Sequence, residues 1–316
     1  MRLALVRSRL LRSVADQVGQ TPLLRLERIG KSAPSVEIYA KLEFANPGGS
    51  VKDRPALSMM LAAISTGQLT SGKTLLDSTS GNTGVAYALF GAALGYPVEL
   101  VMPSNVTKAR KDIVQAFGAK IVYSDPMEGS DGAIRAAQKM IEEGGDRYFY
   151  PNQYANPANP EAHYLGTGRE ILDALGDRIT HFVAGLGTTG TMMGTARRLR
   201  EHPRPIRCIA VEPDDALHGL EGLKHLPSSM VPAIYQRELT DETMRIATED
   251  GWDMADRLAA EEGLHVGHSS GANVLAALRI AEQLHRTQGG GCVVTIIADR
   301  GDRYFAPMKW EKRYTW

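Results

Sequence analysis

A single lysine stands between a turn of small residues and the expected start of a helix, in the segment NPGGSVKDR at 46–54. A cation there faces the positive end of the helix dipole, which is unfavourable unless the lysine serves a purpose. The same dipole, together with desolvation in a cleft, lowers the pKa of an ammonium group. A lysine that is neutral near pH 7 can form a Schiff base with an aldehyde. Lys52 is therefore a candidate for covalent chemistry rather than a solvated surface charge.

Three further junctions are rich in Gly, Ser and Thr: STSGNTG at 78–84, GLGTTGT at 185–191 and GHSSGAN at 267–273. The loop 185–191 follows a predicted strand and opens a predicted helix, so its backbone N–H groups could bind a phosphate. Its three threonine hydroxyls would suit a terminal phosphate dianion. An aldehyde cofactor with one phosphate is pyridoxal 5′-phosphate, which needs a phosphate site and one activated lysine. The polar residues of 78–84 and 267–273 could also be no more than helix caps.

The loop 185–191 also fits a second cofactor. Gly185, Gly187 and Gly190 have the G-x-G-x-x-G spacing, and Glu212 ends the next predicted strand, where a dinucleotide site needs its ribose-binding acid. A nicotinamide-dependent oxidoreductase that uses this loop therefore stays open.

The elements that must position these loops alternate between strand and helix. Strand-like apolar runs occupy 36–43, 73–78, 97–103, 119–124, 147–150, 180–186, 206–213 and 292–299. Segments of helical period occupy 83–94, 106–117, 130–143, 160–175, 190–201 and 271–286. Such alternation indicates βαβ units and parallel sheets covered by helices. The Pro- and Asn-rich segment 150–164 is the best boundary, so we expect two α/β lobes with a cleft between them.

Length and charge narrow the class of protein. A chain of 316 residues has room for about two domains. Thirty-six basic residues balance thirty-six acidic ones without a dense block of either sign, which argues against nucleic acid or a membrane as partner and favours a small ligand. Cys208 and Cys292 lie in apolar strand-like runs and are expected to be reduced core thiols of a cytosolic protein.

Targeting and metal signals are weak. No apolar stretch is long enough to span a bilayer. The start of the chain carries four arginines before its first acidic residue, which favours an amphipathic helix and leaves an organellar targeting segment as the alternative. His265 and His268 have no further ligand at a suitable interval, so no metal site is expected.

The residues around Lys52, KLEFANPGGSVKDR, resemble the signature of the fold-type II pyridoxal-phosphate enzymes, and specifically the cysteine synthase and cystathionine β-synthase family. SGNTG about thirty residues later, the Gly/Thr loop and a late SSG follow in the family's order. The likeness runs from VGQTPLLRL at 18–26 to DRGDRYF at 299–305, and the stretch 211–235 looks closer to the B type of cysteine synthase. Position 48 departs from the pattern, since it is glycine where many relatives carry Thr or Ser.

The resemblance implies an α/β, fold-type II architecture like that of the tryptophan synthase β chain. The smaller lobe would comprise 46–156 with 1–23 packed on it, and the larger lobe 24–45 plus 157–316. The active site would lie in the cleft, and the lobes would close on the substrate.

The resemblance also assigns roles to residues. Lys52 would be the Schiff-base lysine and the base that removes the Cα proton. Asn82 would hydrogen-bond the phenolic oxygen of the cofactor, and Ser269 would face its ring nitrogen. The cofactor phosphate would be bound by Gly187, Thr188, Thr189, Gly190 and Thr191, and the substrate carboxylate by Thr79, Ser80, Thr83 and Gln153. Lys224 lies where relatives that use O-phosphoserine place an arginine, and it is either a phosphate ligand or a solvated lysine on a mobile lid.

The implied reaction is cysteine synthesis by a homodimeric, cytoplasmic enzyme. A hydroxyl at the ring nitrogen does not keep that nitrogen protonated, which favours β-elimination. O-acetylserine, or O-phosphoserine, would be eliminated to an aminoacrylate, and sulfide or another thiol donor would add to give L-cysteine. Alternatives are a cystathionine β-synthase-type replacement with homocysteine, the oxidoreductase above, and a catalytically silent binding protein. A yellow protein bleached by Lys52→Ala would separate pyridoxal phosphate from the other classes.

Overall fold

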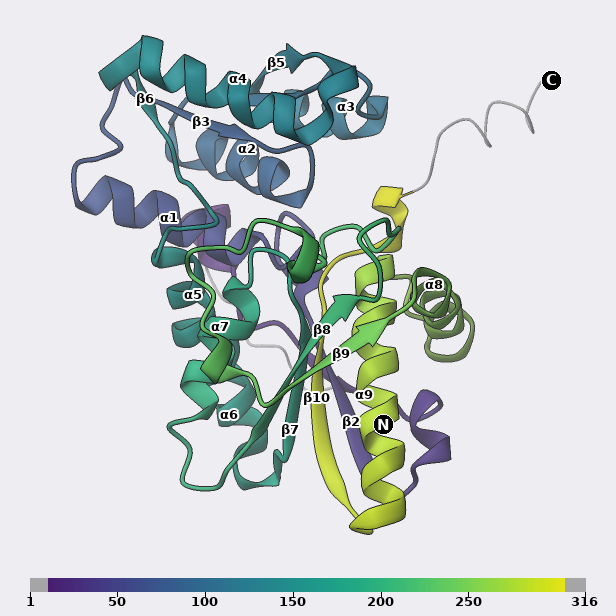
Figure 1. Ribbon diagram of the computed structural model, residues 1–316. Helices are drawn as coiled ribbons and strands as arrows, with labels where there is room; N and C mark the ends of the chain where they lie inside the picture. The colour runs from purple at the N-terminus through teal and green to yellow at the C-terminus, as the bar shows by residue number, and fades with distance from the viewer. Residues whose placement is uncertain (1–10, 305–316) are drawn as a thin grey trace, which may run out of the picture.

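The computed structural model describes residues 11–304. They form two sheets whose strands are mostly parallel, and each sheet is flanked by helices (Figure 1). The predicted α/β fold class is confirmed. The arginine-rich start at 1–10, for which we predicted an amphipathic helix or a targeting segment, lies outside the described residues, as does 305–316 of the predicted larger lobe.

The smaller sheet has four parallel strands in the order β5-β4-β3-β6. These strands are β3 (Thr74–Ser78), β4 (Val98–Pro103), β5 (Lys120–Ser124) and β6 (Tyr148–Phe149). The helices around this sheet are α1 (Asp53–Ser65), α2 (Asn82–Leu94), α3 (Lys108–Ala116) and α4 (Gly129–Gly144). Every residue of β4 is buried, because helices cover both faces of the sheet, and this explains its continuous apolar run. Helix α2 is followed by Gly95, whose φ of 78° is a left-handed conformation that glycine adopts without strain.

The larger sheet has six strands in the order β1-β2-β10-β7-β8-β9, of which only β1 runs antiparallel to its neighbour. These strands are β1 (Leu23–Arg25), β2 (Val36–Leu42), β7 (His181–Gly185), β8 (Arg207–Pro213), β9 (Glu242–Ile246) and β10 (Gly291–Ile297). Its helices are α5 (Ala158–Ala162), α6 (Arg169–Leu175), α7 (Gly190–Leu199), α8 (Thr248–Arg257) and α9 (His268–Thr287). Figure 1 shows α8 and α9 on one side of this sheet and α5, α6 and α7 on the other.

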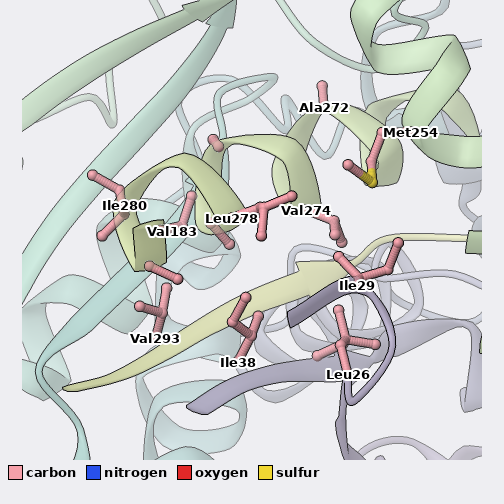
Figure 2. Packing of buried hydrophobic residues seen from close by; sticks show 14 of the residues in the cluster. Leu26, Ile29, Ile38, Val183, Met254, Ala272, Val274, Leu278, Ile280 and Val293 are labelled. Carbon is pink, nitrogen blue, oxygen red and sulfur yellow. The ribbon is translucent and has the colours of Figure 1, made fainter. Parts of the chain in front are cut away.

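The core of the larger lobe is built by alternation along its strands. Val183 of β7 and Val293 of β10 point toward α9, where they pack with Val274 (Figure 2). Their chain neighbours Phe182 and Val294 point to the opposite face and belong to the core beneath α6 and α7. Full burial of one such side chain stabilises the fold by about 1.5–3 kcal/mol. The sheet is therefore a rigid support for the loops at its strand ends.

Strand β9 and helix α8 are the longer elements without a counterpart in the sequence prediction for residues 11–304. Strand β9 is ETMRI, an edge strand whose residues are mostly exposed or half-buried, so it lacks the apolar run that marks the inner strands. Helix α8 is TEDGWDMADR, in which buried residues are few. The domain boundaries given above stay a prediction, although the Pro- and Asn-rich segment 150–164 does follow β6 of the smaller sheet and contains α5, which lies beside the larger one.

Candidate active site

The carboxyl ends of strands from both sheets open onto one cavity of about 770 Å³. Its walls include the turn 47–52, the loop 78–83 and the segment 221–224. A narrow second pocket of about 50 Å³ shares Lys52, Asn82 and other wall residues with the cavity. A cavity of this size at strand ends is the usual place for a small ligand in an α/β protein.

Lys52 lines both pockets. The turn before it is closed by the bond from Gly49 N–H to the Asn46 carbonyl, 2.8 Å, and Gly49 has a φ of 79° that favours glycine. Lys52 is the residue that precedes α1, and its own N–H donates to Ser50 Oγ at 3.2 Å. Burial lowers the pKa of the Lys52 amine, while the nearby Asp299 carboxylate acts in the opposite direction. The proton on Lys52 is thus held less firmly than on a solvated lysine.

Close packing against Asp53 explains why position 48 is glycine. Its N–H donates to the carboxylate of Asp53, and a Cβ at position 48 would lie 2.5 Å from Asp53 Oδ1. The departure from the family pattern at this position therefore leaves room for the Asp53 side chain next to Lys52. Burial raises the pKa of Asp53 to about 7, although the hydrogen bond from Gly48 opposes the shift.

The loop after β3 brings the predicted substrate-binding residues to the cavity. Thr79, Ser80, Asn82 and Thr83 all line it, and Gln153 faces them from the segment after β6. Thr83 Oγ1 donates to Gln153 Oε1 at 3.0 Å. The residue that caps α2 is Gly81, and no side chain caps this helix end. The alternative that Ser80 and Asn82 are only helix caps is therefore wrong.

The same correction applies at the start of α9. Gly267 occupies the capping position there, again without a side-chain cap. Ser269 is buried and lines the narrow pocket together with Thr189 and Thr191.

The loop 185–191 leads from β7 into α7. Thr189 precedes the helix with a φ of 71°, and its hydroxyl is buried without a hydrogen-bond partner among residues 11–304. A Cβ at Gly187 would lie 2.2 Å from the Gly222 carbonyl oxygen, so glycine is required by close approach of the backbone. Thr188 lines both pockets, and Gly190 is the one predicted phosphate ligand that lines neither of them.

These features fit pyridoxal 5′-phosphate. The first N–H groups of α7 have no partner within the helix, and an unpaired threonine hydroxyl lies beside them. An amine with a lowered pKa lies in the same pocket. The pocket thus offers N–H and O–H donors for a phosphate and one nucleophile for an aldehyde.

Two residues of the segment 150–164 support the phosphate loop, although the sequence analysis interpreted this segment as a domain boundary and predicted a site role only for its Gln153. Asn159 Nδ2 donates to the Gln153 carbonyl at 2.7 Å and to Thr188 Oγ1 at 3.1 Å. The buried His163 contacts Thr191 Oγ1 through Nε2 at 3.3 Å. Burial lowers the pKa of His163 well below its usual value, so the ring is neutral there. The only feature of the sequence that could have indicated these roles is that both residues are polar and lie in or beside the NPANP stretch at 156–160.

Residues of the C-terminal segment that were not predicted also line the two pockets: Asp299 lines the narrow pocket, Arg303 the cavity, and Tyr304 both. Asp299 is 1% exposed and accepts a hydrogen bond from Asn82 Nδ2 at 2.6 Å. The hydroxyl of Tyr304 donates to the same carboxylate, and Arg303 donates to Asn82 Oδ1 and to the Gly48 carbonyl. The motif DRGDRY at 299–304 is therefore part of the cavity wall.

At its mouth the cavity is rich in charge. Lys224 lines it with Nζ 5.0 Å from the centre of the Tyr154 ring, and the Lys224 N–H donates to the Leu186 carbonyl at 2.7 Å. Arg110 of α3 forms an ion pair with Glu221, so this contact joins the two lobes across the cleft.

Glu212, the acid that a dinucleotide site would need, is engaged elsewhere. It is buried on β8 and pairs with Arg245 of β9 at 3.2 Å. It does not line either pocket described here. Glu212 is therefore not placed to bind the ribose of a dinucleotide in these pockets, which argues against the nicotinamide alternative.

The structure of residues 11–304 also bears on a metal site and on a membrane span. In that range no three His, Cys, Asp or Glu side chains are grouped to hold a metal ion. His268 instead lies between two aromatic rings, 5.1 Å from Trp252 and 5.7 Å from Tyr304 between ring centres. Over the same residues no helix combines the length and the apolar character needed to cross a bilayer.

Comparison with known proteins places this site in a family. Residues 14–299 match the model of the family described as pyridoxal-phosphate dependent enzyme, and the chain belongs to it. Within that family the chain is similar to a cysteine synthase of Aquifex aeolicus, with 49% identity over 92% of this chain and 90% of the relative. It is 40% identical to cysteine synthase B of Salmonella typhimurium, over 93% and 94% of the two chains. The crystal structure of a cysteine synthase from Entamoeba histolytica superposes with a TM-score of 0.92, at 35% identity over 98% of this chain and 94% of that one.

The expected family and its cofactor, pyridoxal 5′-phosphate, are thereby confirmed. The relatives are enzymes of cysteine synthesis, so the oxidoreductase and the silent binding protein are not favoured.

Proposed function

We propose that this chain is a cysteine synthase that replaces the β-substituent of O-acetylserine or O-phosphoserine with sulfide. The observation that carries the proposal is that the cavity and the narrow pocket, which share Lys52, bring this lysine together with the hydroxyl-rich loop 79–83 and the phosphate-type loop 187–191. Cysteine synthases that match over nine-tenths of the chain support the same reaction. Bound pyridoxal phosphate supplies the electron-withdrawing ring that makes the Cα proton of the substrate removable and lets the β-substituent leave.

Lys52 is the group that binds the cofactor aldehyde and moves the Cα proton. Its amine lies in the cavity wall, and burial lowers its pKa toward the range in which it can accept a proton near neutral pH. Asp299 opposes that shift, so it limits how far the pKa falls.

The cofactor is held at three points in this proposal. Thr188, Thr189 and Thr191, with the glycines 187 and 190, bind the phosphate at the start of α7, where backbone N–H groups and the helix dipole favour an anion. Asn82 donates to the phenolic oxygen. Ser269 faces the ring nitrogen as a neutral hydroxyl, so the ring need not be protonated.

The substrate carboxylate binds at the start of α2. Thr79, Ser80 and Thr83 contribute hydroxyls there, and the first N–H groups of the helix point toward the cavity. Gln153 is held by Thr83 and completes the site from the opposite wall. This arrangement binds an anion without an arginine.

Lys224 is proposed to contact the leaving group. It lines the cavity and carries a charge that can attract a phosphate, but it lacks the two-pronged geometry of arginine. We therefore expect O-acetylserine as a substrate, with O-phosphoserine accepted through this lysine.

Assembly and location are carried over from the family resemblance. We propose a homodimer in the cytoplasm. Cys208 and Cys292 are both buried free thiols, as expected in a reducing compartment. Size-exclusion chromatography with light scattering would show the oligomeric state, and a monomer at micromolar concentration would contradict the dimer.

A visible spectrum with added substrates tests the function. The purified protein should be yellow, and the band should change when O-acetylserine or O-phosphoserine is added without an acceptor. Sulfide should then restore the band and release L-cysteine. A protein that stays colourless with added pyridoxal phosphate would refute the proposal, and turnover with homocysteine but not with sulfide would favour the cystathionine β-synthase-type reaction instead.

A further inference from the structure

Asp299 is a buried carboxylate in the wall of the narrow pocket, and the proposed reaction gives it no direct task. It follows β10, and its Oδ2 accepts hydrogen bonds from Asn82 Nδ2 at 2.6 Å and from the Tyr304 hydroxyl. Its Oδ1 is buried and has no hydrogen-bond partner among residues 11–304. A buried carboxylate oxygen without a partner is costly, so its retention calls for an explanation.

The bond to Asp299 restrains the amide of Asn82. That amide has two N–H donors and one acceptor oxygen. One donor is taken by Asp299, and the oxygen accepts from Arg303. Rotation of the amide would break both contacts, so the second N–H is held in one direction and stays available to a ligand in the cavity that Asn82 lines.

The position of Asp299 links three parts of the pocket. Its backbone pairs with Ser50 in the turn before Lys52. Its Oδ1 lies next to Gly267, where an added Cβ would be only 2.2 Å from this oxygen. Gly267 is the residue that precedes α9, the helix that carries Ser269. Asn82, which it contacts, is the first residue of α2 beside the smaller sheet. A carboxylate of the larger lobe at this junction can fix the Asn82 amide of the smaller lobe relative to the turn before Lys52 and to the helix that carries Ser269.

We propose that Asp299 is a positioning residue, which orients the Asn82 amide so that its second N–H points at the phenolic oxygen of pyridoxal phosphate. A hydrogen bond to a carboxylate is shorter and stronger than one between neutral groups, so Asp299 is well suited to hold an amide still. The inference rests on the proposed role of Asn82.

A double-mutant cycle on cofactor affinity tests this, with no substrate present. The dissociation constant of pyridoxal phosphate is measured by titrating cofactor-free protein and following absorbance. We expect Asn82→Ala to weaken binding about tenfold and Asp299→Ala about threefold to tenfold. Because Asp299 acts through Asn82, adding Asp299→Ala to the Asn82→Ala variant should change the constant by less than about twofold.

Independent losses that multiply in the double variant would overturn the inference, as would an Asp299→Ala variant that binds the cofactor like the parent protein. Asp299→Asn keeps an acceptor oxygen and should restore affinity to within about twofold of the parent. If Asp299→Ala does not fold, Asp299→Ser, whose hydroxyl is too short to reach Asn82, takes its place in the cycle.

Glu99→Gln is the matched control. Glu99 is also a buried carboxylate that accepts a tyrosine hydroxyl, from Tyr148 at 3.0 Å, but it lies on β4 and does not line the cavity. Its substitution should leave the cofactor affinity unchanged, and a loss equal to that of Asp299→Ala would refute a specific role for Asp299. A parent protein that binds no pyridoxal phosphate would refute the proposed function as well, whereas failure of the cycle alone leaves the cysteine synthase proposal standing.

Discussion

Two groups of buried and half-buried polar side chains flank Lys52, and they are built in opposite ways. We call Lys41, Glu43, Arg54 and Glu170 the paired cluster, because each charge faces an opposite one within 2.9 Å. We call Asn82, Asp299, Arg303 and Tyr304 the pocket cluster, in which one oxygen of Asp299 is left without a partner among residues 11–304. Arg54 of the paired cluster lies two residues after Lys52, and the residues of the pocket cluster line the cavity or the narrow pocket.

The contacts of the paired cluster are those expected of residues that stabilise the fold. Arg54 donates to Glu43 at 2.6 Å and to Glu170 at 2.7 Å, while Lys41 reaches Glu170 at 2.6 Å. Burial by itself would raise the pKa of Glu170, but the hydrogen bonds and charges of Arg54 and Lys41 lower it to about 2. Buried charges are tolerated when every group is paired in this way. The cluster ties the start of α1, and thus Lys52, to β2 and α6.

The pocket cluster and its neighbours show the opposite pattern. Burial raises the pKa of Asp299, and burial raises that of Asp53 to about 7, because neither carboxylate faces enough opposite charge. Incomplete pairing of buried groups next to a cavity is typical of sites that bind a ligand. The comparison therefore separates residues that hold Lys52 in place from residues that prepare the pocket.

The largest effect is expected at Lys52 itself. Lys52→Ala removes the amine on which the proposed proton transfer depends, so the rate of cysteine formation should fall by at least about 10³-fold. The yellow colour should be lost, while the melting temperature of the cofactor-free protein should change little because Lys52 belongs to neither cluster. Initial rates, absorbance and thermal melts check these three outcomes. A variant that keeps both colour and turnover would contradict the proposed mechanism.

Loss of Arg54 should break the paired cluster. Arg54→Ala leaves Glu43 and Glu170 buried with too little positive charge, which should lower the free energy of unfolding by about 3–5 kcal/mol. Urea unfolding of the cofactor-free protein measures the change. Arg54→Lys is the control, since it keeps the charge but not the fork that spans both carboxylates, and it should recover only part of the loss. A loss below about 1 kcal/mol would show that the cluster is not structural.

Asp53 and Glu170 should make folding stability depend on pH in opposite directions. The folded-state pKa of Asp53 is raised to about 7, so folding stability contributed by its protonated form is lost as the pH rises from about 4 to about 7. Asp53→Asn removes this loss and should raise the free energy of unfolding by about 2 kcal/mol at pH 8, with little change at pH 4. Urea unfolding at both pH values is the measurement.

Glu170→Gln is the matched comparison for that experiment. Because the folded-state pKa of Glu170 is lowered to about 2, its stabilisation is present above the unfolded value of 4.5 and is lost as the pH falls toward 2. Glu170→Gln should therefore destabilise the protein at pH 8. If both variants shifted stability in the same direction at pH 8, the distinction between the two kinds of site would be wrong.

The sequence predicted much of this molecule because the relevant signals are local. Strand β4 reads VELVMP since both of its faces are buried, and the loops around Lys52 and at 185–191 carry turn residues that the backbone needs there. Strand β9 was missed because an edge strand has no such apolar run.

The missed site residues depend on contacts between distant parts of the chain. Asn159 meets Thr188 across 29 positions, and Asp299 meets Asn82 across 217. A single asparagine or aspartate carries no local pattern that names its partner. The loop motifs could thus be recognised from sequence, whereas the side chains that hold those loops required the fold.

The smallest expected effect concerns the leaving group and tests how the mouth of the cavity differs from its interior. Lys224 stands at that mouth over the Tyr154 ring, where water weakens its charge. Lys224→Met keeps much of the side-chain length and removes the charge. The ratio of kcat/KM for O-phosphoserine to that for O-acetylserine should fall about threefold to tenfold, because only a phosphate leaving group needs the cation. Competition assays with both donors measure this ratio directly. Since Lys224 is only half-buried, the ratio for the parent protein should also fall as salt is raised, and the variant should lose that salt dependence. An unchanged ratio would mean that Lys224 is a solvated lysine and that leaving-group selection lies deeper, beside Arg303.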